Sequence, residues 1–230
     1  MRRWKPRFAQ KFSRTVTVSA LDRKLLLDAN PRLKVDVVPN GVDTQALQLL
    51  PPAENGPVLI FVGNMDYLPC VDAVVTFHRE VLPIIRNAQP DVSLWIVGIN
   101  PRPEVRALEG DGVHVTGWVD DLRSYYQRSS VVIVPLRAGS GTRLKILEAM
   151  ALGRPVVSTT LGCEGLEVID GEHLFIADRP VEFAGRVLDL LRDRYLGQEI
   201  SKRARELVVN RYDWNPIARK LEQIYTEVAE

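Results

Sequence analysis

The sequence has few of the side chains on which disulfide scaffolds, metal centres and nucleophilic sites depend. Its 230 residues include two cysteines and three histidines. Cys70 and Cys163 lie far apart with no CxxC spacing, which excludes a disulfide-rich scaffold, so we expect both to be small core residues. His78, His114 and His173 are also dispersed, and none neighbours a plausible nucleophile. We therefore expect structural histidines and no metal site.

Long apolar runs and an excess of one charge are missing as well. No run approaches the roughly 18 apolar residues of a membrane-spanning helix, and the amino terminus has no apolar signal-peptide core. The net charge is +1, and 46% of the residues are hydrophobic, which is enough for a packed core. No GxGxxG pattern follows an expected strand, which argues against a dehydrogenase. We therefore expect a folded cytoplasmic protein.

Basic charge is concentrated at the start of the chain. Residues 1–37 hold ten Lys or Arg and three Asp, net +7, so the remaining 193 residues have net charge −6. Trp4, Phe8 and Phe12 recur every four residues, which places them on one face of a helix. Two interpretations stay open: this face packs on its own protein, or the basic segment lies on the inner face of an anionic membrane. Nucleic-acid binding is not expected, because the basic residues do not continue along the chain.

Strand and helix patterns alternate through most of the sequence. Short β-branched and apolar runs predict seven strands, at residues 15–19, 34–38, 57–63, 92–98, 113–117, 130–136 and 155–159. Segments with helical spacing lie at residues 21–28, 71–86, 103–108, 121–128 and 142–152. This alternation predicts an α/β doubly wound, Rossmann-like parallel sheet covered by helices. Asp120 and Asp121 precede one of these helices, and we expect them to cap it rather than bind a metal.

The end of the chain and one internal segment depart from the alternation. Helical stretches at residues 181–193, 198–210 and 214–228 predict a carboxyl-terminal helical appendage. Residues 40–57, NGVDTQALQLLPPAENGP, are typical of a loop-rich linker. The residues before this linker hold too few elements for a core of their own, and we interpret them as the end of a larger domain. The predicted division is residues 1–39, a linker at 40–56, a main domain at 57–210 and a closing helix at 211–230.

Residues 134–150, VPLRAGSGTRLKILEAM, predict an anion site. A buried strand ends here, a glycine loop follows, and a helix is expected to begin at Thr142. The unpaired N–H groups at a helix start favour a phosphate, which glycines allow to come close. Arg143 and Lys145 are expected to add mobile positive charge, and Glu148 is placed to accept hydrogen bonds from ribose hydroxyls. A surface helix with solvated charges is the alternative.

The same helix lies in a stretch that resembles a known family. Residues 141–178, GTRLKILEAMALGRPVVSTTLGCEGLEVIDGEHLFIAD, are similar to the donor-binding half of group 1 retaining glycosyltransferases of the two-lobe GT-B type. Other stretches resemble the family's interlobe linker, first strand–turn–helix, base-binding region and closing crossover helix. In that order they are VVPNGVD (37–43), FVGNMDYLPCVDAV (61–74), VTGWVDDLRSYYQRSSVVIVPL (115–136) and RYDWNPIARKLEQIY (211–225). The resemblance covers roughly residues 15–228.

The resemblance implies roles for individual residues. Gly63 lets the diphosphate approach the backbone, Trp118 and Val119 contact the base mostly through main chain, and Glu148 binds the ribose. The implied donor-binding set is Gly63, Asn64, Trp118, Val119, Gly139, Ser140, Gly141, Thr142, Arg143, Lys145 and Glu148. The catalytic side chains are implied to lie mainly in an amino-terminal acceptor lobe, of which residues 1–39 are a remnant. No metal and no cofactor besides the nucleotide-sugar substrate is implied.

Two departures from the family pattern concern charge. Many members carry a second glutamate eight residues before Glu148, where this sequence has Ser140. Many also carry an Arg and a Lys after the first strand, and GNMDYLPCVDAV (63–74) has neither. Arg143 and Lys145 are expected to supply the missing charge. Glu167 also falls where the family often has a glutamate, and it stays without an assigned role.

The resemblance implies a glycosyltransferase that moves a sugar from a nucleotide-diphosphate sugar to a saccharide or lipid-linked acceptor, as in exopolysaccharide synthesis. We expect these residues alone not to transfer sugar, and we expect the amino-terminal segment to self-associate or to adhere to a membrane. Two alternatives stay open. One is a non-catalytic nucleotide-sugar-binding module that works with a separate partner lobe. The other is a nucleotide-sugar epimerase of the same fold.

Overall fold

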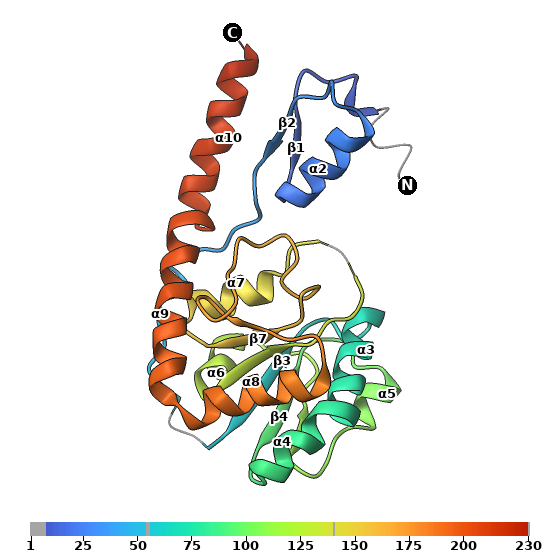
Figure 1. Cartoon of the computed structure of the whole chain (residues 1–230), viewed down its shortest axis with the longest axis vertical. Helices are drawn as coiled ribbons and strands as arrows, with labels where there is room; N and C mark the ends of the chain where they lie inside the picture. The colour runs from blue at the N-terminus through green and yellow to red at the C-terminus, as the bar shows by residue number, and fades with distance from the viewer. Residues whose placement is uncertain (1–7, 54–55, 140, 230) are drawn as a thin grey trace.

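The computed structural model describes residues 8–53, 56–139 and 141–229. Figure 1 shows a large α/β unit, a small unit built from the first residues, and a long carboxyl-terminal helix that runs from the former to the latter. No helix in the described part of the chain is long and apolar enough to cross a membrane. The large unit contains the main hydrophobic core.

The main sheet has six strands, all parallel. They are β3 (Val58–Val62), β4 (Ser93–Val97), β5 (Val113–Val115), β6 (Val131–Val134), β7 (Val156–Ser158) and β8 (Phe175–Ile176). The spatial order is β5-β4-β3-β6-β7-β8, so the chain winds outward in one direction from β3 and in the other from β6. In such sheets ligands bind at the switch point, beyond the carboxyl ends of the two central strands.

The predicted parallel sheet with flanking helices is therefore confirmed, although β8 was missed. Its two residues lie in a loop-rich stretch with no strand-length apolar run, and they are placed by pairing with β7. The predicted strands are observed with ends one to two residues shorter. Each of the four residues of β6 is buried, which matches its continuous apolar sequence.

Helices flank this sheet. They are α3 (Leu68–Thr76), α4 (Leu82–Ala88), α5 (Pro103–Arg106), α6 (Leu122–Arg128), α7 (Leu144–Ala151), α8 (Pro180–Arg192) and α9 (Arg194–Arg211). The expected single helix at 71–86 is divided by a π-helical turn, Phe77–Val81. Pro83 explains this division, because proline has no N–H to donate to the carbonyl four residues earlier, and its ring displaces that carbonyl. The helix expected from Thr142 begins at Leu144 instead.

The small unit contains β1 (Thr15–Thr17), α2 (Ala20–Ala29) and β2 (Val35–Val37), with the two strands parallel. Phe8 and Phe12 are 39% and 67% exposed. Phe12 therefore does not pack on the described part of the protein, and Ala9 takes the buried position. Phe8 is more covered than Phe12, so the packed interpretation stays open for it. Trp4 lies outside the described residues.

The last helix, α10 (Trp214–Ala229), packs against the small unit. Ile217 and Ile224 contact Val38, and Arg14 forms ion pairs with both Asp36 and Glu227. These contacts agree with a closing helix that crosses back onto the first residues of the chain. The domain boundaries themselves stay a prediction.

The linker is attached to the start of α10 by hydrogen bonds. Asp213 accepts from the backbone N–H of Thr44 at 3.1 Å and from its hydroxyl at 2.6 Å. The hydroxyl of Thr44 lowers the pKa of the Asp213 carboxyl. The hydrogen bonds of the ionised Asp213 carboxylate therefore stabilise the fold at pH values above the ordinary carboxyl pKa. This stabilisation is lost as the pH falls from the ordinary pKa through the lowered pKa of Asp213. Gly41 lies between Ile217 and the carbonyl of Tyr212, with no room for a side chain.

Candidate functional site

The candidate site lies at the carboxyl ends of β3 and β6, on either side of the switch point. Gly63 follows β3 directly, and its N–H donates to the carbonyl of Val97 at the end of β4. Asn64 is exposed, and its side-chain oxygen accepts from the N–H of Asp66 at 3.0 Å. The loop after β6 leads into α7, which carries Lys145 and Glu148. The sequence therefore places the two expected sides of the site next to each other.

Lys145 reaches across to the turn after β3. Its Nζ lies 2.9 Å from where a Cβ on Gly63 would stand, so the missing side chain of Gly63 makes room for the ammonium group. The same Nζ lies 4.2 Å from the centre of the Phe61 ring and 3.9 Å from Cys70 Sγ. No carboxylate oxygen of a described residue lies within 4.0 Å of it.

The surroundings of Lys145 disfavour its unpaired positive charge. Burial lowers the pKa of Lys145, opposed by the nearby Cys70 and Glu148 and reinforced by Arg143. A buried ammonium without a directly paired carboxylate is costly in free energy. An anion that enters the site removes that cost. The sequence indicated a mobile charge at this position, and in the structure the ammonium group lies over the Phe61 ring of β3.

Arg143 is also less mobile than the sequence indicated. It stands at the N-cap of α7 and is 8% exposed, because its guanidinium folds toward the loop. Its Nη2 and the Tyr67 hydroxyl lie 3.2 Å and 3.0 Å from where a Cβ on Gly139 would stand. Gly139 and Gly141 adopt positive φ values of 107° and 90°, which few other residues tolerate. The loop therefore has the backbone freedom that the prediction assigned to it.

Thr142 contributes a further polar group to the loop. Its Oγ1 is buried and has no hydrogen-bond partner among the described residues. Buried hydroxyls are nearly always hydrogen-bonded, so this one is available to a ligand. Ser140 lies outside the described residues.

Glu148 lies one helical turn beyond Lys145, on the same face of α7. Burial raises the pKa of Glu148, while Lys145 and a hydrogen bond from the Tyr126 hydroxyl lower it. Tyr126 is 1% exposed, and its hydroxyl oxygen lies 3.4 Å from the Lys145 carbonyl oxygen, so this carbonyl and Glu148 compete for its one proton. Glu148 is thus a half-buried carboxylate, oriented by a tyrosine and suited to accept hydrogen bonds from hydroxyl groups.

The predicted base-binding residues lie farther along the same edge of the sheet. Trp118 follows β5, is 74% exposed, and donates from Nε1 to Asp120 at 3.2 Å. Val119 packs against the main core. Asp121 caps α6, as predicted, by accepting from two backbone N–H groups of that helix. Two strands separate β5 from β6, so Trp118 and α7 follow strands that are not neighbours in the sheet.

Some residues around the site were missed by the sequence prediction. Phe61, Tyr67 and Tyr126 surround the charged groups, and Cys70 was expected only as a core residue. A phenylalanine in a buried strand and a tyrosine in a helix give no site pattern by themselves. The histidines have structural contacts: His114 stacks on Trp95 at 4.3 Å, and the ring of His173 accepts from a backbone N–H.

Comparisons with known proteins give a consistent assignment. Residues 56–193 match the family described as glycosyl transferases group 1. The phosphatidyl-myo-inositol mannosyltransferases of Mycobacterium leprae and Mycobacterium tuberculosis are 29% and 30% identical to this chain. Each alignment covers 96% of this chain and 60% or 61% of the relative. The chain therefore spans about 60% of the length of these curated relatives.

Solved structures show the same fold. TarM aligns with a TM-score of 0.81 at 15% identity, covering 96% of this chain and 45% of TarM. Anabaena Alr3699/HepE, in complex with UDP and glucose, aligns with a TM-score of 0.79 at 18% identity, covering 98% of this chain and 66% of that protein.

Proposed function

The chain belongs to the group 1 glycosyltransferases, and we propose that it binds a nucleotide-diphosphate sugar at the α7 site. The observation that carries this proposal is the buried ammonium of Lys145 against Gly63, with Glu148 one turn farther along the same helix face. Such an arrangement suits a ligand with a diphosphate next to a ribose.

Each group of the site has a task in this proposal. The diphosphate lies between the Gly63 turn and the start of α7, where Lys145 and the Thr142 hydroxyl bind its oxygens. Glu148 accepts from the ribose hydroxyls, and the backbone around Trp118 and Val119 lies against the base. Negative charge grows on the diphosphate as the glycosidic bond breaks, and Lys145 stabilises it without a metal ion.

The sugar is proposed to pass to a saccharide or lipid-linked acceptor in surface polysaccharide synthesis. The mycobacterial relatives are named as mannosyltransferases of phosphatidyl-myo-inositol, and a Klebsiella pneumoniae relative is named as a protein of the cps region. Because the chain spans about 60% of the first relatives, we assign it the donor side of the reaction. We propose that transfer needs a further lobe to complete the acceptor side.

A thermal-shift screen tests the donor assignment. UDP, GDP, ADP and their sugar conjugates are added to the purified chain at increasing concentration. One nucleoside diphosphate and its sugar are expected to stabilise the protein by about 2.7 kcal/mol at 100 times the dissociation constant, because they bind only the folded state. No stabilisation by any of them would contradict the assignment.

The same samples separate the proposed transferase from the alternatives. In the presence of acceptors, the chain alone is expected to bind the nucleotide sugar without transferring the sugar. If a separately produced amino-terminal lobe restores transfer, this result supports the proposal that the acceptor side lies in that lobe. Conversion of the nucleotide sugar without any acceptor would instead identify an epimerase. Transfer by the 230 residues alone would place an acceptor site within them.

The first residues are proposed to contact the membrane. Residues 1–37 have net charge +7, and Phe8 and Phe12 are exposed. Basic charge with exposed aromatic rings favours an anionic lipid surface. The chain is expected to sediment with phosphatidylglycerol vesicles and not with phosphatidylcholine vesicles, and Phe8→Ser with Phe12→Ser is expected to weaken this binding. Equal sedimentation with both vesicle types would contradict the proposal.

A further inference from the structure

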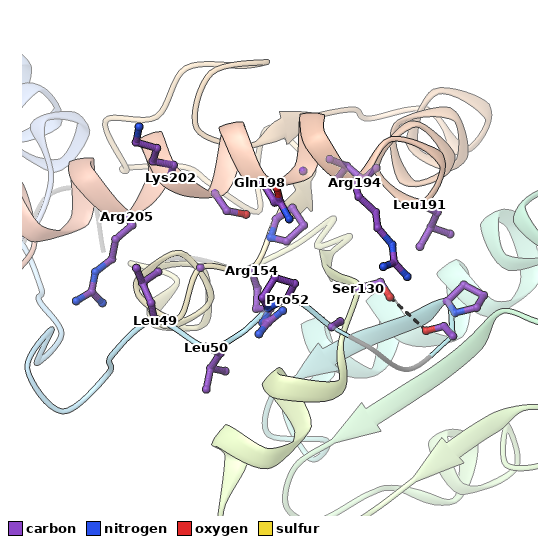
Figure 2. A pocket seen from close by; sticks show the side chains of 18 of the residues that line it. Leu49, Leu50, Pro52, Ser130, Arg154, Leu191, Arg194, Gln198, Lys202 and Arg205 are labelled. Atoms are coloured by element: carbon purple, nitrogen blue, oxygen red, sulfur yellow. Dashed lines mark hydrogen bonds between the residues drawn. The ribbon is translucent and has the colours of Figure 1, made fainter.

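A cavity lies at the amino ends of the strands of the main sheet, opposite the candidate nucleotide site. It has a volume of about 540 Å³. Pro57, Ser130 and Pro155, which line it, stand directly before β3, β6 and β7, at the amino ends of these strands. Figure 2 shows the cavity between α9 on one side and the residues around Leu49 and Pro52 on the other. A ligand here would have no contact with Lys145 or Glu148 at the carboxyl ends.

Arg154 is the main polar group of this cavity. It follows α7 and is 3% exposed. Its Nη2 donates to the carbonyl of Pro51, but its Nε is buried without a hydrogen-bond partner, and no carboxylate of a described residue pairs with it. Burial lowers the pKa of Arg154 to about 10, so the guanidinium stays charged at neutral pH. An unpaired buried charge is costly unless a ligand supplies the counter-charge.

Ser201 gives a second, independent indication of a ligand. It projects from α9, lines the same cavity and is 5% exposed. Its Oγ has no hydrogen-bond partner among the described residues. A helical serine commonly bonds back to a carbonyl of its own helix, and this one does not. Two buried polar groups from distant parts of the sequence are thus unsatisfied at one cavity.

The remaining lining has basic and apolar side chains, the amides of Gln89 and Gln198, and one carboxylate, Glu206. Arg194, at the start of α9, extends toward Ser130, and its guanidinium has no hydrogen bond or ion pair with a described residue. Arg205 is occupied, because it donates to the carbonyls of Thr44, Leu47 and Ala151. The apolar wall includes Leu49, Leu50, Pro52, Leu190 and Leu191. Arg194, the unsatisfied Nε of Arg154 and the apolar wall together favour an anion with an organic part.

We propose that this cavity binds a small organic phosphate. The phosphoryl group lies on Arg154 and the Ser201 hydroxyl, Arg194 closes over it, and the organic part lies on the leucines. A tetrahedral phosphoryl group offers three oxygens to donors that come from different directions, whereas a carboxylate offers two in one plane. The volume is within the range of about 300 to 1,000 Å³ that is usual for small-molecule sites.

Calorimetry with phenyl phosphate and inorganic phosphate tests the proposal. Phenyl phosphate is expected to bind the unmodified chain more tightly than inorganic phosphate or benzoate. Ser201→Ala and Arg194→Ala are each expected to weaken phenyl phosphate binding about 10- to 100-fold, because each removes a hydrogen bond to a charged group. Both variants are expected to fold, since the Ser201 hydroxyl has no partner and Arg194 is exposed.

Two controls separate this cavity from the nucleotide site and from net charge. Arg203→Ala removes an exposed arginine of the same helix that does not line the cavity, and it is expected to leave binding unchanged. Lys145→Met removes the ammonium of the nucleotide site, which does not line this cavity, so the binding that Ser201→Ala and Arg194→Ala weaken is expected to persist in it. The proposal is overturned if phenyl phosphate does not bind, if benzoate binds equally well, or if binding is lost in Lys145→Met and retained in Ser201→Ala and Arg194→Ala.

Discussion

Replacing Lys145 with methionine is expected to weaken nucleoside diphosphate binding by about 10- to 150-fold, or roughly 1.5 to 3 kcal/mol, without unfolding the protein. The ammonium is buried beside Gly63 and Phe61 with no carboxylate within 4.0 Å. Methionine keeps an unbranched side chain that is one atom shorter and removes the buried charge, so the fold loses little packing. Isothermal titration calorimetry gives the affinity, and urea unfolding gives the stability.

Three comparisons make this result specific. The corresponding nucleoside is expected to bind Lys145→Met almost as well as the unmodified chain, because it has no diphosphate. Glu148→Gln is expected to weaken nucleoside and nucleoside diphosphate alike, since its partner is the ribose. Lys24→Met makes the same substitution at an exposed lysine outside the site, and it is expected to have no effect on the binding of either ligand. Equal losses for nucleoside and nucleoside diphosphate in Lys145→Met would contradict the diphosphate role.

The lowered pKa of Lys145 adds a pH readout to the same variant. The folded state binds this proton less tightly than the unfolded state, so stability rises as the pH increases from the lowered pKa toward the ordinary value near 10.4. Diphosphate binding weakens over the same range, because the ammonium loses its charge. Lys145→Met lacks this titration, so its alkaline stability curve is expected to be flatter than that of the unmodified chain.

Gly98→Ala is expected to destabilise the protein by more than about 4 kcal/mol or to prevent folding. Gly98 follows β4 with a φ of 146°, and a Cβ there would overlap the carbonyl oxygen of Gly63. The two glycines let the turns after β3 and β4 pack backbone against backbone. Because the obstructing atom belongs to the main chain, only a shift of the Gly63 turn would relieve the overlap.

Gly110→Ala is the matched control for this substitution. Gly110 also has a positive φ, 120°, but a Cβ there meets nothing within 4 Å. Its substitution is expected to cost only the backbone strain, about 1 to 2 kcal/mol. Urea unfolding monitored by circular dichroism measures both variants. Similar losses for Gly98→Ala and Gly110→Ala would show that close packing at the Gly63 turn is not important.

The sequence predicted the main sheet well because its strands are short, continuous apolar runs. A run such as Val131–Val134 is typical of a strand that is buried on both faces of a parallel sheet. Its local sequence pattern and its position in the fold therefore indicate the same structure. β8 was missed because its two residues depend on pairing with β7. The π-helical turn before Pro83 was missed because apolar spacing continues through it.

The charge environment of the sites could not be read from the sequence. The order of Lys145 and Glu148 predicted that both face one ligand, but the burial of Lys145 depends on the space that Gly63 leaves in the turn after β3. Arg154 and Ser201 lie 47 residues apart in sequence and meet only through the packing of α9 beside the end of α7. Local patterns do not encode such contacts.

A crystal structure of the chain with its preferred nucleoside diphosphate tests the donor site most directly. The diphosphate is expected between the Gly63 turn and the Lys145 ammonium, with a ribose hydroxyl within hydrogen-bond distance of Glu148. A nucleotide bound instead at the amino ends of the strands, or one whose ribose lies away from Glu148, would contradict the donor-site assignment.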